Sequence, residues 1–340
     1  MALFIHCCPK CNSENHKPHT TYTVGDGENR QVHRCSDCGE YFSDTKNTPL
    51  EGLKTPLSKI ATVLDALNEG ISINAACRVF HIGKKTVKRW LKRLGELKQP
   101  LLLYVLCHQF IQLIIEGDEL YTKVGKNKLP SDSEGWTIVL TERTSRFLVD
   151  LSCGEKNTEL FTKAIEILAL VIEQTDDLSL ITDGERRYGN VLFDICKEVI
   201  RTGEVGRPKT TLPEGVKVRV KNKGAQSHKR GPKRAKYQAP QKEHPKTIQN
   251  LEDKDIHANH VEAFNSALRR RLSCYRRKTN TYAKDTSPLQ TRLDAQWVLH
   301  NFVHPHFTLK QVPAVVLGVV DKGLSWFELF RIQFFSPVQT

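Results

Sequence analysis

The stretch Leu178-Ser179-Leu180-Ile181-Thr182-Asp183-Gly184 is a short apolar run that ends in an aspartate and a glycine. Such a run, bounded by turn residues, is typical of a buried strand and places Asp183 at its carboxyl end. Ligands of open α/β sheets commonly lie outside such strand ends. We therefore predict an α/β sheet with Asp183 at its functional edge. The alternative is a simple Asp-Gly turn, which is the commoner role of this pair.

The α/β pattern begins at about residue 101. Residues 136–140 and 146–151 are predicted to be neighbouring strands, and Glu159 to Gln174 has helical periodicity. Antiparallel strands, a helix, the strand at 178–182 and a later helix form an order compatible with a ribonuclease H-like core. We assign residues 101–320 to this catalytic domain.

Two further acidic residues lie in separate settings. Asp118 lies in Ile115-Glu116-Gly117-Asp118-Glu119-Leu120, and Glu262 lies in a helix predicted to run from Ala258-Asn259 to Leu272. The apolar residues of this helix that face the core lie on a different stripe from Glu262, which can therefore project toward the strand ends. Mg²⁺ prefers carboxylate oxygens, and two such ions can clamp the attacking and leaving oxygens of a phosphoryl transfer. We predict Asp118, Asp183 and Glu262 as a catalytic trio for Mg²⁺ (or Mn²⁺), with Glu116 and Glu119 left open as ligands in place of Asp118.

The composition favours an anionic partner. The 340 residues carry a net charge of +13 and give a pI near 9.2, and a basic surface that neutralises phosphates releases counterions. Nucleic acid is the leading candidate. The first residues lack a basic n-region, and we find no span apolar enough to cross a bilayer. We expect a cytoplasmic, nucleoid-associated protein without membrane contact.

Four cysteines near the start form two C-x-x-C pairs: Cys8 with Cys11, and Cys35 with Cys38. This spacing lets the four thiolates share one tetrahedral Zn²⁺, so we predict a structural zinc ribbon over residues 1–50. Free thiols or a disulfide are the alternative, which a reducing compartment disfavours. Cys7, His6 and His33 lie outside the first-choice ligand set.

Residues 55–97 read as a helix-turn-helix. Apolar residues recur at helical spacing from Ile60 to Leu67, Ser72 is a suitable N-cap for a short second helix, and His81-Ile82-Gly83 is the predicted turn. The third helix buries Val87, Trp90, Leu91 and Leu94. Its other face can meet a major groove through Lys84, Lys85, Lys88, Arg89 and Lys92, with Arg93 beside them. A bundle with merely solvated lysines is the alternative.

Two further basic regions follow. The segment at about 203–250, with Gly206-Arg207-Pro208-Lys209 and Lys229–Arg234, is predicted to be a basic insertion that contacts DNA or is a plain loop, with a short strand at 216–220. After Glu262, a phosphate-binding ridge is predicted at Arg269, Arg270, Arg271, Arg276, Arg277 and Lys278.

At the acidic positions the chain resembles the insertion-sequence one family of bacterial and archaeal transposases. The matching runs are Glu116–Tyr121 with Val124–Lys126, Thr182–Gly184 with Tyr188, and Asn259–Asn265 through Leu268–Leu272, continuing to Lys284. The resemblance implies a DDE transposase that binds the terminal inverted repeats of an insertion sequence in double-stranded DNA. It further implies Mg²⁺-dependent cleavage and strand transfer by a homo-oligomer, with Asn259 and His260 beside the metals or the DNA.

Two other functions use the same features. The chain could be a DNA-binding regulator with a degenerate catalytic domain, in which case it binds a DNA site without cutting it. It could also be a ribonuclease H-like nuclease or junction resolvase, which needs the carboxylates but no terminal repeats.

Overall fold

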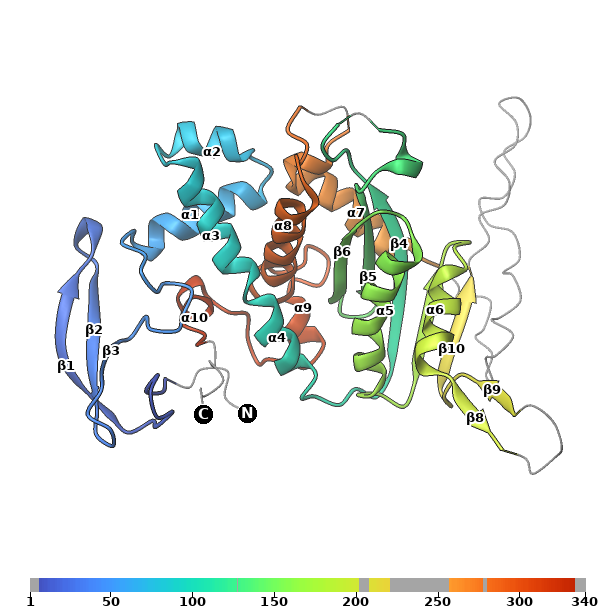
Figure 1. Cartoon of the computed structure of the whole chain (residues 1–340), viewed down its shortest axis with the longest axis horizontal. Coiled ribbons are helices and arrows are strands. Elements are labelled where there is room, and N and C mark those ends of the chain that lie inside the picture. The colour runs from blue at the N-terminus through green and yellow to red at the C-terminus, as the bar shows by residue number, and fades with distance from the viewer. Residues whose placement is uncertain (1–5, 127, 202–207, 221–256, 278–279, 334–340) are drawn as a thin grey trace.

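The computed structural model describes residues 6–126, 128–201, 208–220, 257–277 and 280–333. Its centre is a mixed five-stranded sheet in the order β10-β7-β4-β5-β6 (Figure 1). β4 pairs antiparallel with β5, and β5 with β6, whereas β7 runs parallel to both β4 and β10. The strands are β4 (Leu113–Tyr121), β5 (Trp136–Glu142), β6 (Leu148–Gly154), β7 (Leu178–Thr182) and β10 (Val216–Val220). The predicted α/β class is confirmed, and the order is consistent with a ribonuclease H-like core.

Helices cover both faces of this sheet (Figure 1). α5 (Thr158–Ile172) and α6 (Arg187–Cys196) pack on one face, and α7 (Asn259–Arg271) and α8 (Thr286–Val298) on the other. Successive strand residues point to opposite faces. In β5, Ile138 therefore packs toward α5 and α6, whereas Val139 joins the cluster that contains α7 and α8.

The segment predicted to be a helix-turn-helix, and called so below, contains α1 (Leu57–Asn68), α2 (Ile73–Val79) and α3 (Lys84–Gly95). Ser72 caps α2 as predicted, because its side chain accepts a hydrogen bond from the Ala75 backbone N–H. The apolar stripe of α3 is buried. It shares one hydrophobic cluster with α8, and at Gly95 an added Cβ would lie 3.2 Å from the Thr291 carbonyl oxygen. The helix-turn-helix is thus packed directly on the helices that cover the sheet.

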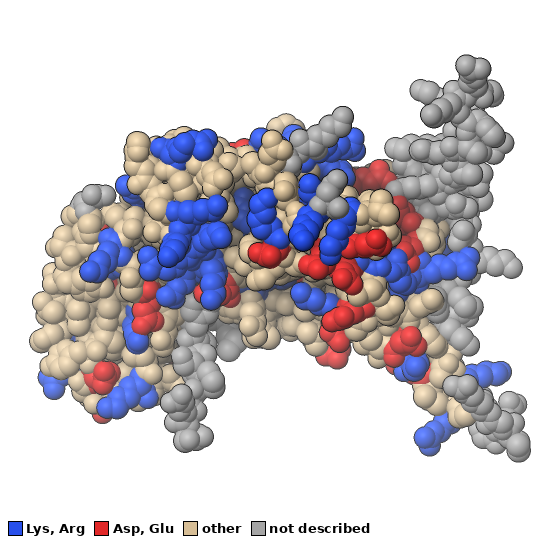
Figure 2. Space-filling model, turned by 45° about the horizontal axis from the view of Figure 1, so that its top comes forward, with Lys and Arg blue, Asp and Glu red and all other residues tan. Residues whose placement is uncertain are grey.

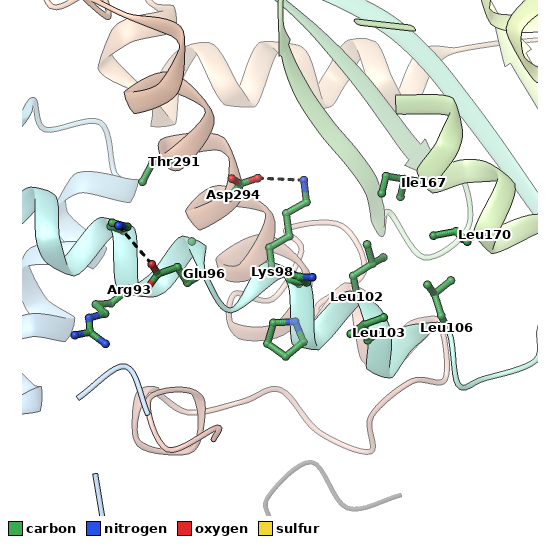
Figure 3. Close-up of a pocket in the computed structure, with 14 residues that line it drawn as sticks. Arg93, Glu96, Lys98, Leu102, Leu103, Leu106, Ile167, Leu170, Thr291 and Asp294 are labelled. Atoms are coloured by element: carbon green, nitrogen blue, oxygen red, sulfur yellow. Dashed lines mark hydrogen bonds and ion pairs between the residues drawn. The ribbon is translucent and has the colours of Figure 1, made fainter. Parts of the chain in front are cut away.

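Helix α4 (Lys98–Val105) follows α3, and its half-buried first residue forms ion pairs with the sheet and with α8. The Lys98 ammonium lies 2.8 Å from Asp150 on β6 and 3.1 Å from Asp294 on α8. Burial alone would lower the pKa of Lys98, but these two carboxylates raise it above its usual value. Lys98 and Asp294 line a hollow of about 800 Å³ between α3, α4, α5 and α8 (Figure 3).

The first described residues form a small antiparallel sheet, β1 (His16–Thr23), β2 (Asn29–Cys35) and β3 (Tyr41–Ser43), beside the helix-turn-helix (Figure 1). The last described residues contact this small sheet, since the Arg331 guanidinium pairs at 3.0 Å with Asp44, which directly follows β3. The remaining elements are the hairpin β8 (Glu198–Ile200) and β9 (Lys209–Thr211), α9 (Pro313–Val316), α10 (Trp326–Leu329), a π-helical turn (Leu299–Val303) and 3-10 turns at Gly25–Gly27, Pro130–Asp132 and Ser273–Tyr275.

Two segments differ in detail from their predictions. The strand expected at 146–151 begins only at Leu148, because Arg146 takes a left-handed turn conformation with φ 62°. The basic insertion at about 203–250 contains β10, which forms an edge of the main sheet, so residues 216–220 belong to the core. Gly206, Arg207 and Lys229–Arg234 lie outside the described residues. No helix in the described part of the chain is long and apolar enough to cross a membrane.

Candidate functional site: a carboxylate cluster at the strand ends

Asp118, inside β4, lies beside Asp183, which directly follows the carboxyl end of the parallel strand β7. Gly117 of β4 pairs with Thr182 of β7, so the next residue in each chain segment is an aspartate. Oxygens of Asp118, Asp183 and Glu119 all lie within 4.8 Å of one another. Carboxylates this close can share a hard divalent cation, so the donor set fits Mg²⁺ or Mn²⁺.

Glu119 enters this cluster as the ligand alternative that the sequence left open. Lys156 donates to its carboxylate at 2.9 Å and lies 3.9 Å from Glu185. Burial raises the pKa of Glu119 and the nearby Asp183 adds to this, although Lys156 opposes the change. A cation at the cluster would favour the charged form of Glu119.

Gly117 is tightly packed among three neighbouring side chains. A Cβ at this position would lie 3.3 Å from Cε1 of Tyr188 and 3.2 Å from side-chain carbons of both Leu140 and Thr182. Tyr188 is fully buried, and burial raises its pKa well above the ordinary value. The close packing of β4 on α6 therefore explains the glycine in Glu116-Gly117-Asp118-Glu119.

Glu116, the other open alternative, anchors helix α7. Its Oε2 accepts hydrogen bonds from the backbone N–H groups of His260 at 2.9 Å and Val261 at 3.0 Å. Its Oε1 accepts from Arg143 at 2.8 Å, and Arg143 also donates to the His257 carbonyl. A carboxylate at a helix N-terminus satisfies otherwise unpaired N–H groups. Glu116 therefore positions the helix that carries Glu262.

Helix α7 also contacts Asp118 directly. The Asn265 side-chain amide donates to Oδ2 of Asp118 at 2.8 Å, and the Glu119 backbone N–H donates to Oδ1 at 2.9 Å. Both oxygens of Asp118 are thereby oriented. Glu262 lies half-buried three residues before Asn265, hence on the same side of the helix. Among the described carboxylates, the group within 4.8 Å does not include Glu262.

Sequence reasoning did not assign Asn265 a role at the site. Its position three residues after Glu262 placed it on the same helical stripe, which was the available signal. The hydrogen bond to Asp118 depends on how α7 docks on β4, and helical spacing alone does not specify that docking.

Basic side chains also gather on the surface of the molecule. Figure 2 shows Lys and Arg gathered on one face, with exposed Asp and Glu beside them. The α3 residues of the predicted DNA-binding set are all exposed: Lys84, Lys85, Lys88, Arg89 and Lys92. Near α7, Arg270, Arg276 and Arg277 are exposed and Arg269 is half-buried.

Two of these arginines have defined neighbours. Burial and repulsion from Arg277 lower the pKa of Arg269, and attraction to Asp118 opposes this. Arg269 therefore lies close enough to Asp118 for their charges to attract each other. Arg276 donates to the Gly70 carbonyl at 2.9 Å, which ties the region after α7 to the helix-turn-helix.

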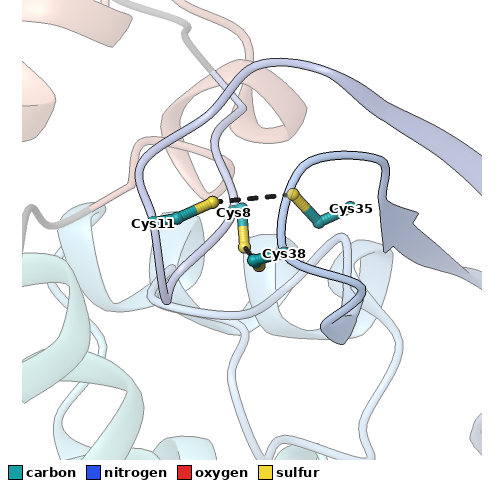
Figure 4. Close-up of side chains that lie close together, drawn as sticks. All are labelled: Cys8, Cys11, Cys35 and Cys38. Atoms are coloured by element: carbon teal, nitrogen blue, oxygen red, sulfur yellow. Dashed lines mark hydrogen bonds between the residues drawn. The ribbon is translucent and has the colours of Figure 1, made fainter.

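The side chains of the two C-x-x-C pairs, Cys8 with Cys11 and Cys35 with Cys38, point toward one another (Figure 4). The Sγ atoms of Cys8 and Cys38 are 3.5 Å apart, and those of Cys11 and Cys35 are 3.6 Å apart. Disulfide-bonded sulfurs would be about 2 Å apart, whereas Zn–S bonds of about 2.3 Å in a tetrahedron place sulfurs about 3.8 Å apart. A backbone hydrogen bond from Cys38 lowers the pKa of Cys35 to about 7. The donors and their spacing fit a structural Zn²⁺.

Cys7, His6 and His33, which the sequence left outside the ligand set, lie elsewhere. The Cys7 backbone N–H donates to the Gln333 side chain at 2.8 Å, and its thiol is not part of the four-cysteine group. His6 and His33 form a separate group with His16.

The comparisons with known proteins gave little. No protein-family model and no curated protein matches the chain. One similar solved structure is the Mos1 mariner paired end complex with Mn, at 9% identity over 42% of this chain and 57% of that chain, with a TM-score of 0.17. Another is the Mos1 transposase paired-end complex with left transposon end, at 11% identity over 42% and 56%, with a TM-score of 0.16. The aligned part thus spans little more than half of each of those chains.

Proposed function

We propose that this chain is a DDE transposase. It binds the terminal inverted repeats of an insertion sequence as an oligomer, cleaves DNA at the element's end and joins the freed 3′ hydroxyl to target DNA. The observation that supports this most is the register of β4 and β7, which sets Asp118 beside Asp183 with α7 held against them.

Asp118 and Asp183 would hold Mg²⁺ or Mn²⁺, with Glu262 from α7 as the third predicted ligand and Glu119 beside them. When bound, paired divalent ions neutralise charge on the attacked phosphodiester and activate the attacking oxygen. The chain's own residues supply positioning. Asn265 and the Glu119 backbone fix both oxygens of Asp118, and Glu116 fixes the start of α7.

The basic surface would hold DNA next to this site. The exposed lysines of α3 fit the major groove of an element end, and Arg269, Arg270 and Arg277 fit phosphates near the cleaved strand. Arg276 joins these two regions through Gly70, so an end held by α3 keeps a fixed relation to α7. Phosphate contacts of this kind predict binding that weakens steeply with salt.

The test is cleavage of a duplex that carries the terminal repeats flanking the reading frame. With Mg²⁺, the wild-type protein should nick at the repeat end, and Asp118→Asn, Asp183→Asn and Glu262→Gln should each remove the activity. Glu166→Gln, an exposed change on α5, is the matched control and should cut normally. Normal nicking by the Asp118 or Asp183 variant would falsify the assignment.

The other two functions correspond to different outcomes of the same assay. Specific binding of the repeats without metal-dependent cleavage by the wild-type protein would identify a DNA-binding regulator. Cleavage of branched or hybrid substrates that carry no repeats would identify a nuclease or resolvase.

A further inference from the structure

Three histidines meet beside the zinc-ribbon sheet, away from the four cysteines. His6 precedes the first C-x-x-C pair, His16 begins β1 and His33 lies in β2. Each offers a ring nitrogen within 4.8 Å of those of the other two. Nδ1 of His16 lies 3.1 Å from Nδ1 of His33, and the other nitrogen of His16, Nε2, lies 3.2 Å from Nδ1 of His6.

The hydrogen bonding of His16 indicates which of its nitrogens is free to bind. Its Nε2 lies 2.9 Å from the backbone oxygen of His6, and a hydrogen bond there requires the proton on Nε2. The lone pair is then on Nδ1, which faces Nδ1 of His33. Metal-bound histidines commonly donate their other N–H to a carbonyl in this way. Zn–N bonds of about 2.0–2.1 Å in a tetrahedron place nitrogens about 3.3–3.4 Å apart, close to the 3.1 Å between the Nδ1 atoms of His16 and His33.

The surroundings suit a metal that exchanges with solvent. The three rings line a hollow of about 660 Å³ together with Asp44, Arg331 and Phe327. Phe42 provides an apolar neighbour, with its ring centroid 5.4 Å from those of His6 and His16. The hollow gives an entry path, and Asp44 or a water could complete the coordination.

We propose that His6, His16 and His33 form a second site for Zn²⁺ or a similar borderline divalent cation, separate from the four-cysteine site. The site lies where the ribbon meets the last described residues, since Arg331 pairs with Asp44 and Gln333 bonds Cys7. Metal bound here would therefore stiffen the contact between the two ends of the described chain. This inference does not depend on the proposed transposase activity.

The test is metal stoichiometry of the purified full chain, saturated with Zn²⁺, desalted and measured by atomic emission. The wild-type protein should hold two equivalents, and the double variant His16→Ala/His33→Ala should hold one. His19→Ala is the matched control, because His19 lies on the same strand, exposed against Tyr41 and outside the cluster. It should retain two equivalents.

Co²⁺ distinguishes the two sites in the same protein. One equivalent should show sulfur-to-metal charge transfer, and the other should add ligand-field absorption without that band. A wild-type chain that binds only the sulfur-ligated equivalent would overturn the proposal, as would a folded double variant that keeps both. If the double variant unfolds and loses both, the Co²⁺ spectrum of the wild-type second equivalent decides.

Discussion

The side-chain amide of Asn265 donates to Oδ2 of Asp118 across 2.8 Å and joins helix α7 to the central strand of the sheet. The Glu119 backbone holds the other oxygen of Asp118. A carboxylate fixed at both oxygens is oriented before any cation arrives. Helix α7 thus orients Asp118, and it also carries Glu262, the third predicted ligand.

Replacing Asn265 by alanine should reduce Mg²⁺-dependent cleavage at least tenfold, because Asp118 loses its orienting donor. The lost hydrogen bond should also lower the free energy of unfolding by about 1–3 kcal/mol. Cleavage kinetics and urea unfolding measure the two effects. Ser266→Ala, an exposed change on the same helix, is the control, and an equal loss of activity there would argue against a specific role for Asn265.

Replacing Glu116 by alanine should lower the free energy of unfolding by about 3–5 kcal/mol, because it leaves the buried Arg143 guanidinium and two helix N–H groups without their acceptor. Glu116→Gln retains an acceptor for the backbone and should cost less. Denaturant unfolding measures both. If the alanine variant lost less than about 1 kcal/mol, Glu116 would not be the anchor of α7.

Replacing Gly117 by alanine should lower the free energy of unfolding by about 1–3 kcal/mol, because its Cβ would press against the Tyr188 ring. Tyr188→Leu should relieve this contact. The double variant is therefore expected to lose less stability than the two single losses added together. Simple additivity in thermal or urea unfolding would place the strain elsewhere.

Cys8→Ser should remove zinc from the ribbon and make residues 6–45 sensitive to proteolysis, because a structural zinc site needs its four thiolates. Cys7→Ser is the adjacent control, since Cys7 lies outside the cluster. It should retain the metal. Zinc content and limited proteolysis of both variants measure the difference, and loss of zinc from the Cys7 variant alone would reverse the ligand assignment.

His300 predicts a pH effect on stability. It is buried, and burial lowers its pKa from 6.5 to about 3, with a hydrogen bond to the Arg146 carbonyl opposing the shift. A histidine with a lowered folded-state pKa stabilises the protein above pH 6.5, and this contribution is lost as pH falls from 6.5 toward 3. The loss can reach about 1.4 kcal/mol per pH unit.

The measurement for His300 is the free energy of unfolding from pH 7 to pH 4. The wild-type protein should lose stability more steeply than His300→Gln, which retains a donor for the carbonyl and does not titrate. Parallel curves for the two proteins would show that other groups dominate the acid response.

The strands were predictable where burial made the local pattern clear. Leu178–Thr182 and Val216–Val220 were identified with the bounds that the structure has, since an apolar run or a strict alternation marks a strand without reference to the rest of the chain. Arg146 was placed in a strand because arginine, unlike glycine or asparagine, does not signal a left-handed backbone conformation.

The candidate site was harder to predict, because it depends on contacts between distant segments. Asp118 and Asp183 were recognisable from their strands, but the register that brings them together is set by the pairing of β4 with β7. Nothing in the local sequence distinguishes Glu116 from Glu119 as a candidate ligand. The side chains of β4 alternate between the two faces of the sheet. Glu116 therefore meets the start of α7, whereas Glu119, on the other face, joins the carboxylate cluster.

The close approach of α3 to α8 at Gly95 ties the helix proposed to contact DNA to the helical layer that covers the sheet. Exchanging the helix-turn-helix for an unrelated one would uncover apolar surface on α8 and disturb the layer that supports the sheet. New specificity should therefore arise by substitution of the outward lysines and arginines of α3. Under the proposed function, the DNA-contacting helix and the catalytic sheet would therefore be inherited as one unit.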